Sequence, residues 1–300
     1  MTQDRLQEAL RGVRGLVLDA DGVLVLQGAA LPGSVEAVRA LGERGIPFRV
    51  VTNFSSLHRS TLADLFARGG LSIEPDRIIT GTSATAAYTS ARFAGRPLFV
   101  LAASDARREF DGQHIVTADE ADRSPPGSIA AVVIGDAGED LSYRNIDVAF
   151  RLVRGGAELV AMHRNPWWLT PRGPTIDAGA YVVGLEFATG QRATVLGKPA
   201  PAVFRQAVAG LAADLEERLP RSAFAMVGDD LRADVAAAQR VGLRGILVLS
   251  GKTSAAEAAR AARAPGRGPD AVAATLADVV AALDSTQPSR NSTQPRGPRA

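Results

Sequence analysis

Two aspartates close the first apolar stretch of the chain, in the sequence VLDADGVL at residues 17–24. Asp19 follows the apolar run directly, and Asp21 stands two positions later, before a glycine. A carboxylate at the end of a buried strand is costly unless a partner or a metal ion compensates for its charge. An Asp-Gly pair is also a common turn. The pair alone therefore allows two interpretations, a turn or part of a reactive site.

Three further polar groups also follow apolar stretches. They are Thr52 and Asn53 after FRVV, Lys198 in TVLGKP, and Asp229, Asp230 and Asp234 in GDDLRAD. Singly, each group has a plain explanation: a capping pair, a solvated lysine, or a helix N-cap followed by a surface acid. Open parallel sheets bind ligands at the carboxyl ends of their strands. Four polar groups at four strand ends therefore indicate one shared site.

The residue types in these groups favour phosphoryl transfer. Several carboxylates in one cleft repel one another unless a divalent cation lies among them. Carboxylate and carbonyl ligands, without histidine or thiolate, favour a hard ion, best Mg²⁺. A lysine with hydroxyl and amide donors completes a pocket for a dianion such as phosphate. A cation, a lysine and a carboxylate nucleophile together describe transfer through an aspartyl-phosphate.

Apolar strands alternate with helical segments along the chain, which predicts an α/β fold with a doubly wound parallel sheet. We predict strands at 15–19, 46–53, 223–230 and 245–251, and helices at 34–45, 59–70 and 231–242. A second alternating block has predicted strands at 97–102, 129–136 and 157–163 and helices at 143–156 and 177–190. Residues 253–284 read as two helices separated by a Pro/Gly loop.

These elements predict a small α/β unit inserted into a larger core. The expected division is 1–83 for the first part of the core, 84–190 for the insert and 191–284 for the second part. Residues 285–300 contain STQP twice and lack an apolar face, so we predict a disordered tail.

The motifs DADGVL, VVTN, GKP and GDDLRAD, in this order, resemble the four motifs of the haloacid dehalogenase superfamily of phosphatases. Only 34 positions separate Asp19 from Asn53, whereas 145 separate Asn53 from Lys198. This spacing is similar to the subclass whose α/β cap follows the second motif. The segments RIITGTSATAAYTSAR, RNPWW, DAGAYVVGLEFATG and TVLGKPAPAVFRQA resemble one branch of that family.

The resemblance implies a role for each reacting group. Asp19 would be the nucleophile, and Asp21 would be the general acid and then the general base. Thr52, the amide of Asn53 and Lys198 would hold the phosphoryl oxygens. Members of the similar branch often lack an acid two residues after the nucleophile, but this chain has Asp21.

The resemblance also implies a Mg²⁺ site. Asp19, the backbone carbonyl of Asp21 and Asp229 would bind the ion. Asp230 and Asp234 would complete or orient this set of ligands.

Two tryptophans stand side by side in the insert, in the segment HRNPWWLTPRG at 163–173. Trp167 and Trp168 either contact the substrate, or pack one in the cap core and the other in a contact between two copies of the chain. Asn165 is the expected substrate contact of this segment, because other members of the subclass often carry asparagine there. We also expect Trp167 to contact substrate, and a homodimer, if formed, to use the cap.

Composition excludes several kinds of protein. The chain has no cysteine, so it has neither disulfides nor thiolate metal sites. Its net charge is +2, and the three arginines after Asp284 leave −1 for the rest, which argues against nucleic-acid binding. No apolar run approaches the length of a membrane span, and the first residues lack a signal peptide's apolar core. We therefore expect a cytoplasmic protein whose partner is a small phosphorylated metabolite.

Several functions remain alternatives to a Mg²⁺-dependent phosphatase. A dehalogenase needs no metal and usually no acid at position 21, so Asp21 argues against it. A phosphomutase shares the aspartyl-phosphate and stays open. A non-catalytic phosphate sensor or scaffold conflicts with the intact set of Asp19, Lys198 and Asp229. The identity of the substrate is not encoded in these motifs.

Overall fold

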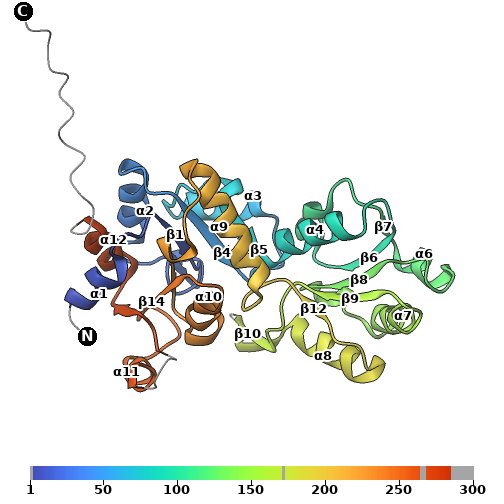
Figure 1. The fold of residues 1–300 in the computed structure, drawn as a ribbon. Coiled ribbons are helices and arrows are strands. Elements are labelled where there is room, and N and C mark those ends of the chain that lie inside the picture. Colours follow the sequence, from blue (N-terminus) through green and yellow to red (C-terminus); the bar gives the residue numbers. More distant parts are fainter. Residues whose placement is uncertain (1–2, 171–172, 264–267, 285–300) are drawn as a thin grey trace, which may run out of the picture.

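The chain forms two parallel β-sheets with helices around them, which lie at the left and right of Figure 1. The computed structural model describes residues 3–170, 173–263 and 268–284. The predicted fold, a doubly wound parallel sheet with an inserted smaller α/β unit, is confirmed. The predicted disordered tail, 285–300, lies outside the described residues.

Within the described part of the chain, the first sheet contains six parallel strands. In spatial order they are β15 (Ala271–Ala273), β14 (Arg244–Val248), β13 (Phe224–Gly228), β1 (Gly15–Leu18), β4 (Phe48–Thr52) and β5 (Ile78–Thr80). The strand order reverses at β1, because β4 and β5 lie on one side of it and β13 to β15 on the other. Residues that follow β1 therefore lie where a doubly wound sheet opens a ligand cleft.

Both faces of this sheet are buried. Leu16 and Leu18 of β1 pack in one apolar cluster and Val17 in another, because successive side chains of a strand point to opposite faces. The helices on the Leu16 face are α1 (Gln3–Leu10), α2 (Ser34–Glu43), α3 (Arg59–Arg68) and α12 (Leu276–Asp284). The helices on the Val17 face are α9 (Pro201–Leu215), α10 (Ala236–Arg240) and α4 (Gly81–Arg92), which leads into the insert.

The second sheet is the centre of the insert, which we call the cap. Its parallel strands, in spatial order, are β12 (Thr194–Val195), β9 (Glu158–Ala161), β8 (Ala131–Ile134), β6 (Leu98–Leu101) and β7 (Ile115–Val116). Its helices are α4 (Gly81–Arg92), α5 (Ser104–Arg107), α6 (Ala118–Arg123), α7 (Tyr143–Arg154) and α8 (Ala178–Thr189). The sheet therefore extends past the expected boundary at residue 190, because β12 pairs with β9.

The cap and the core share buried apolar surface. Val160 and Met162, at and just after the end of β9, belong to the same cluster as Val17 of β1 and Phe204 of α9. Separating the two units would expose this cluster to water, at about 25 cal/mol for each Å² of apolar surface. The shared cluster therefore favours a cap that stays in one place on the core.

The structure adds elements that the sequence pattern did not indicate. Strand β15 lies between α11 (Ala255–Arg263) and α12, where only a loop was predicted, and its alanines carry little strand signal. The predicted helix at 231–242 begins with a π-turn, Leu231–Val235, before α10. Two hairpins complete the fold: β2 (Val25–Leu26) with β3 (Ala29–Ala30), and β10 (Trp167–Thr170) with β11 (Gly173–Ile176). No helix in the described residues combines the length and hydropathy of a membrane span.

A buried arginine links the first part of the core to the second through an ion pair. Arg49 lies on β4 and is 9% exposed. Its guanidinium donates to both carboxylate oxygens of Asp214 on α9, at 2.6 and 2.9 Å, and to the carbonyls of Phe48 and Gly210. The hydrogen bonds from Arg49 hold the pKa of Asp214 below its usual range. Asp214 therefore stabilises the fold when it is ionised.

We predict that Asp214→Asn lowers the free energy of unfolding by about 1 kcal/mol at pH 7, because the buried Arg49 loses its charged partner, although Asp214 is 37% exposed and water screens part of the attraction. The lowered folded-state pKa means that this stabilisation is present above the unfolded aspartate pKa of about 3.9 and is lost as pH falls through the folded value. Urea unfolding at pH 7 and at pH 3 measures both effects. Glu217→Gln is the matched control, because its pair with Arg14 is exposed and should contribute less than about 0.5 kcal/mol. Equal losses in the two variants would contradict the assignment.

Candidate active site

A buried lysine lies between two aspartates at the carboxyl end of the first sheet. Lys198 Nζ is 2.6 Å from Asp19 Oδ1 and 2.7 Å from Asp234 Oδ1. All three side chains are buried. Asp19 directly follows β1, Asp234 lies in the π-turn after β13, and Lys198 lies where the chain returns from the cap. Lys198 is therefore not a solvated loop lysine, and Asp234 is not a surface acid.

A third carboxylate, Asp229, completes the acidic cluster. One carboxylate oxygen from each of Asp19, Asp229 and Asp234 lies within 4.8 Å of the others. The backbone N–H of Lys252 donates to Asp229 Oδ2 at 2.6 Å and orients it. The ligand atoms are oxygens only, which suits a hard divalent cation such as Mg²⁺.

With all three carboxylates ionised, the cluster carries more negative charge than Lys198 neutralises. Burial acts to lower the pKa of Lys198, but Asp19 and Asp234 outweigh it, so the pKa lies above its usual range and the ammonium stays charged. Burial, and then the charge of Asp234, raise the pKa of Asp19 well above its usual range. Burial raises the pKa of Asp229 to about 6. One ammonium cannot neutralise three carboxylates, and a divalent cation among them would remove the excess negative charge.

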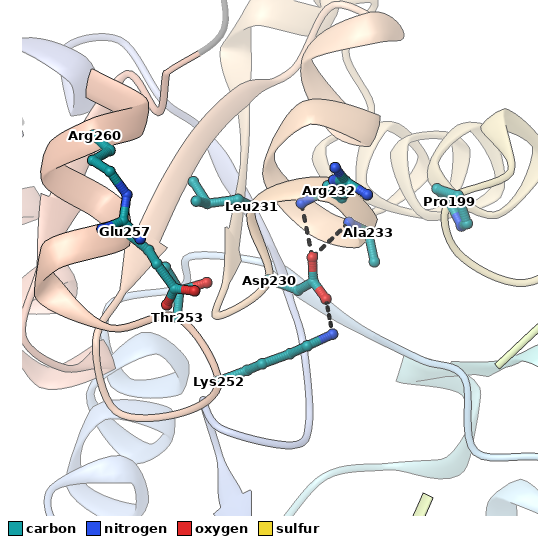
Figure 2. Close-up of a pocket in the computed structure, with 9 residues that line it drawn as sticks. All are labelled: Pro199, Asp230, Leu231, Arg232, Ala233, Lys252, Thr253, Glu257 and Arg260. Atoms are coloured by element: carbon teal, nitrogen blue, oxygen red, sulfur yellow. Dashed lines mark hydrogen bonds and ion pairs between the residues drawn. The ribbon is translucent and has the colours of Figure 1, made fainter. Parts of the chain in front are cut away.

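The other two acids of the motifs lie outside the acidic cluster. Asp21 is exposed in the turn after Asp19, where desolvation raises the pKa of its carboxyl and the charge of Lys198 opposes the shift. Asp230 caps the π-turn: its Oδ1 accepts from the N–H groups of Arg232 and Ala233 at 2.7 and 3.0 Å (Figure 2). The sequence grouped Asp230 with Asp234, but the structure places only Asp234 beside Asp19.

Thr52 and Asn53 lie at the end of β4, next to β1. Thr52 is buried, and its Oγ1 accepts from the N–H of Phe54 at 3.2 Å. The Asn53 side chain donates to the carbonyl of Lys198 at 2.9 Å and fixes the lysine's backbone. Neither residue caps a helix, because the N-cap of α3 is His58. Asn53 therefore lies beside Lys198, and Thr52 directly precedes Asn53 at the end of β4.

Glycines allow the acids to approach the backbone. Gly22 has φ +78°, and a Cβ atom there would lie 2.2 Å from Asp229 Oδ2. A Cβ atom on Gly251 would lie 2.1 Å from the same oxygen, and one on Gly228 would lie 2.3 Å from Asp234 Cβ. The Asp-Gly turn therefore belongs to the acidic cluster, because Gly22 leaves room for the Asp229 carboxylate.

A pocket of about 520 Å³ opens beside Asp230 and Lys252 (Figure 2). Pro199, which follows Lys198, and Asp230, which follows Asp229, line it. Lys252 also lines it and places its Nζ 2.5 Å from Asp230 Oδ2. Lys252 was not among the predicted site residues, although SGKT follows a buried strand as the other four groups do.

The predicted substrate contacts lie in the cap, at or before the β10–β11 hairpin. The N–H of Asn165 donates to His163 Nδ1 at 3.3 Å, and the Asn165 side chain acts to lower the pKa of Asp177. Trp167 and Trp168 are 58% and 44% exposed on β10. Neither tryptophan is buried in the cap core, so the alternative in which one of them packs there is wrong. Within the described residues, no hydrogen bond joins Asn165 or Trp167 to the acidic cluster.

Comparisons of the sequence with known proteins match the chain to one family of hydrolases. Two family models match the chain: haloacid dehalogenase-like hydrolase over residues 16–116, and HAD-hydrolase-like over residues 195–279. The chain is 34% identical over 247 residues to haloacid dehalogenase-like hydrolase domain-containing protein 2 of Bos taurus, covering 82% of this chain and 88% of that one. It is 34% identical over 251 residues to phospholysine phosphohistidine inorganic pyrophosphate phosphatase of Rattus norvegicus, covering 82% and 86%.

Solved structures share this fold over most of the chain. The 4-nitrophenylphosphatase of Thermotoga maritima superposes with a TM-score of 0.78 and 28% identity, covering 92% of this chain and 99% of that one. The glycerol phosphate phosphatase of Mycobacterium tuberculosis, solved in complex with magnesium, superposes with a TM-score of 0.75 and 25% identity, covering 90% and 77%.

We predict that Gly22→Ala disrupts the acidic cluster, because its methyl group would displace the Asp229 carboxylate. Gly28→Ala is the matched control: Gly28 has φ +83° but open space around its Cβ position, so it should cost only about 1–2 kcal/mol of backbone strain. Thermal unfolding with and without Mg²⁺ measures the difference. Mg²⁺ should raise the melting temperature of wild type and Gly28→Ala, and much less that of Gly22→Ala. An equal rise in both variants would show that Asp229 tolerates the methyl group.

Proposed function

Because the chain belongs to the haloacid dehalogenase-like hydrolases, we propose that it is a Mg²⁺-dependent phosphatase that hydrolyses a small phosphorylated metabolite through an aspartyl-phosphate. The observation that carries the proposal is the buried Lys198 ammonium between Asp19 and Asp234, with Asp229 beside them. The names of the phosphatase relatives support the same reaction.

The proposed reaction assigns the two covalent steps to Asp19. Its carboxylate oxygen attacks phosphorus, the bond from phosphorus to the leaving oxygen breaks, and Asp21 donates a proton to that oxygen. Asp21 then accepts a proton from water, whose oxygen attacks phosphorus and releases inorganic phosphate from Asp19. The raised pKa of Asp21 suits a group that must first hold the proton and then take one back.

Charge in the site would hold the phosphoryl group. Lys198 and the hydroxyl of Thr52 would donate to its oxygens, with the Asn53 amide at the end of the same strand. Asp19, Asp229 and the backbone carbonyl of Asp21 would hold Mg²⁺, with Asp234 beside them. When bound, Mg²⁺ supplies positive charge that offsets the phosphoryl oxygens.

The proposed partner is the small substrate alone, with no nucleic acid and no membrane. A homodimer through the cap and a cytoplasmic location stay predictions, which light scattering and cell fractionation would test.

A screen of phosphorylated metabolites with Mg²⁺, read as released inorganic phosphate, tests the activity. We expect turnover of at least one metabolite and of 4-nitrophenyl phosphate, and a loss to below a tenth in Asp19→Asn, because an amide is a poor nucleophile. Asp64→Asn, which changes an exposed acid on α3, is the matched control and should keep full activity. Turnover by Asp19→Asn at wild-type rate would rule out covalent catalysis there. No turnover of any phosphate ester by the wild type would favour the scaffold alternative.

Activity should depend on Mg²⁺ through Asp229. We expect EDTA to abolish turnover, added Mg²⁺ to restore it, and Ca²⁺ to support it poorly, because Ca²⁺ is larger and more loosely coordinated. Asp229→Asn should need at least about tenfold more Mg²⁺ for half-maximal rate, a difference of about 1.4 kcal/mol. Glu257→Gln, a change in the neighbouring pocket but outside the acidic cluster, should need the wild-type concentration. Full activity in EDTA would contradict the metal assignment.

A further inference from the structure

A buried histidine connects the turn after β4 to the cap hairpin. Ser55 lies two residues after Asn53, and His163 lies two residues before Asn165. The distance between Ser55 Oγ and His163 Nε2 is 2.8 Å, and the two residues are 4% and 2% exposed. The contact therefore joins the proposed phosphate-binding residues to the segment expected to contact the substrate.

The hydrogen bonds around His163 fix the proton on its ring. The N–H of Asn165 donates to Nδ1 at 3.3 Å, so Nδ1 carries a lone pair and the proton of the neutral ring lies on Nε2. Nε2–H then donates to Ser55 Oγ, which also accepts from the N–H of Asp136 at 3.3 Å. Burial lowers the pKa of His163, while the charges of Asp177 and Asp136 oppose the shift, so the ring is neutral near pH 7.

The same ring lies beside both ends of the hairpin segment. Asp177 Oδ1 lies 3.8 Å from His163 Nε2, and Asp177 is the N-cap of α8, directly after β11. The N–H of Asp177 donates to the carbonyl of Pro166 at 3.1 Å and closes the base of the hairpin. His163 therefore lies between Ser55 and the base of the hairpin that carries Trp167.

A second polar contact holds the other end of the same turn. The N–H of His58 donates to Asp105 Oδ2 at 2.7 Å, and the N–H of Arg59 donates to Glu109 Oε1 at 2.9 Å. Asp105 and Glu109 belong to the cap, and the Glu109 side chain is 1% exposed. The turn is therefore hydrogen-bonded to the cap at both ends, which restrains the position of Ser55 relative to His163 and the hairpin.

We propose that His163 is a positioning residue. Through Ser55 it sets the distance between the turn after β4 and the β10–β11 hairpin of the cap, and this distance determines which leaving groups the enzyme accepts. This inference rests on the proposed phosphatase function. The positioning role concerns the leaving group of the substrate. The acidic cluster is assigned to the phosphoryl group, and Ser55 and His163 lie outside that cluster. A substrate with a reactive leaving group needs few contacts beyond the phosphoryl group, whereas an alkyl phosphate depends on the cap to hold its leaving group.

The test compares two substrates in His163→Phe, which keeps a ring but loses both hydrogen bonds. The substrates are 4-nitrophenyl phosphate and the alkyl phosphate that the wild type hydrolyses fastest. We expect kcat/KM for the alkyl phosphate to fall at least tenfold, mainly through KM, and that for 4-nitrophenyl phosphate to stay within threefold. His163→Gln, whose amide can donate to Ser55, should recover at least part of the selectivity.

Ser55→Ala is the second variant, because it removes the same hydrogen bond with a smaller change. It should show the same selectivity loss, and the double variant with His163→Phe should lose no more than either single variant. Thr89→Val is the matched control: it removes a buried hydroxyl of α4 that bonds to Thr85 and Gln113, so stability should fall while selectivity stays unchanged. Circular dichroism and melting temperatures establish that each variant is folded.

The outcomes separate the two proposals. An active wild type with equal losses for both substrates in Ser55→Ala and His163→Phe would overturn the positioning role and leave the phosphatase function intact. The same holds if His163→Gln behaves like His163→Phe, or if the single losses multiply in the double variant. A wild type that hydrolyses neither ester would overturn the phosphatase function and the positioning role with it.

Discussion

The burial of one ammonium among carboxylates is the constraint on which the rest of the site depends. Lys198 is 5% exposed and could not remain charged there without Asp19 and Asp234 within 2.7 Å. The two acids, in turn, could not be buried at the end of the sheet without Lys198. The requirement is mutual, and it draws together residues from three distant parts of the chain.

Meeting this requirement limits the backbone around the acidic cluster. Asp229 and Asp234 approach the main chain so closely that only glycine fits at positions 22, 228 and 251. Asp19 and Asp229 both have raised pKa values even with Lys198 present, and a divalent cation among them would lower these values. Buried charges of this kind cost free energy of folding, and groups with strongly shifted pKa values often gather at functional sites.

The cap is attached to this site in a way that couples the two. An apolar cluster continues from Val17 of the core to Met162 of the cap. Polar contacts at Ser55 and at His58 hold the turn after β4 against cap residues. Lys198 itself lies on the return from the cap, with Gly197 bonded to the carbonyl of Met162 at 2.9 Å. A change in the position of the cap would therefore also move the backbone at Lys198. These contacts favour a cap that keeps one position on the core.

The sequence determined the strands and the polar groups that follow them, because a buried strand ending on Asp19, Thr52 or Asp229 leaves a local pattern of apolar residues followed by polar ones. It also determined the order of the motifs, and with it the family and the inserted cap. Only the tertiary structure decided that Asp234 joins Asp19 and Asp229 while Asp230 caps a turn, because both acids stand in the same six residues and local pattern cannot tell their directions. It likewise decided that Lys252 orients Asp229, and that His163 meets Ser55 across 108 positions of sequence. Contacts between residues so far apart in sequence depend on how the two sheets pack together. Hydrophobic periodicity and residue propensity describe local structure only and do not predict such packing.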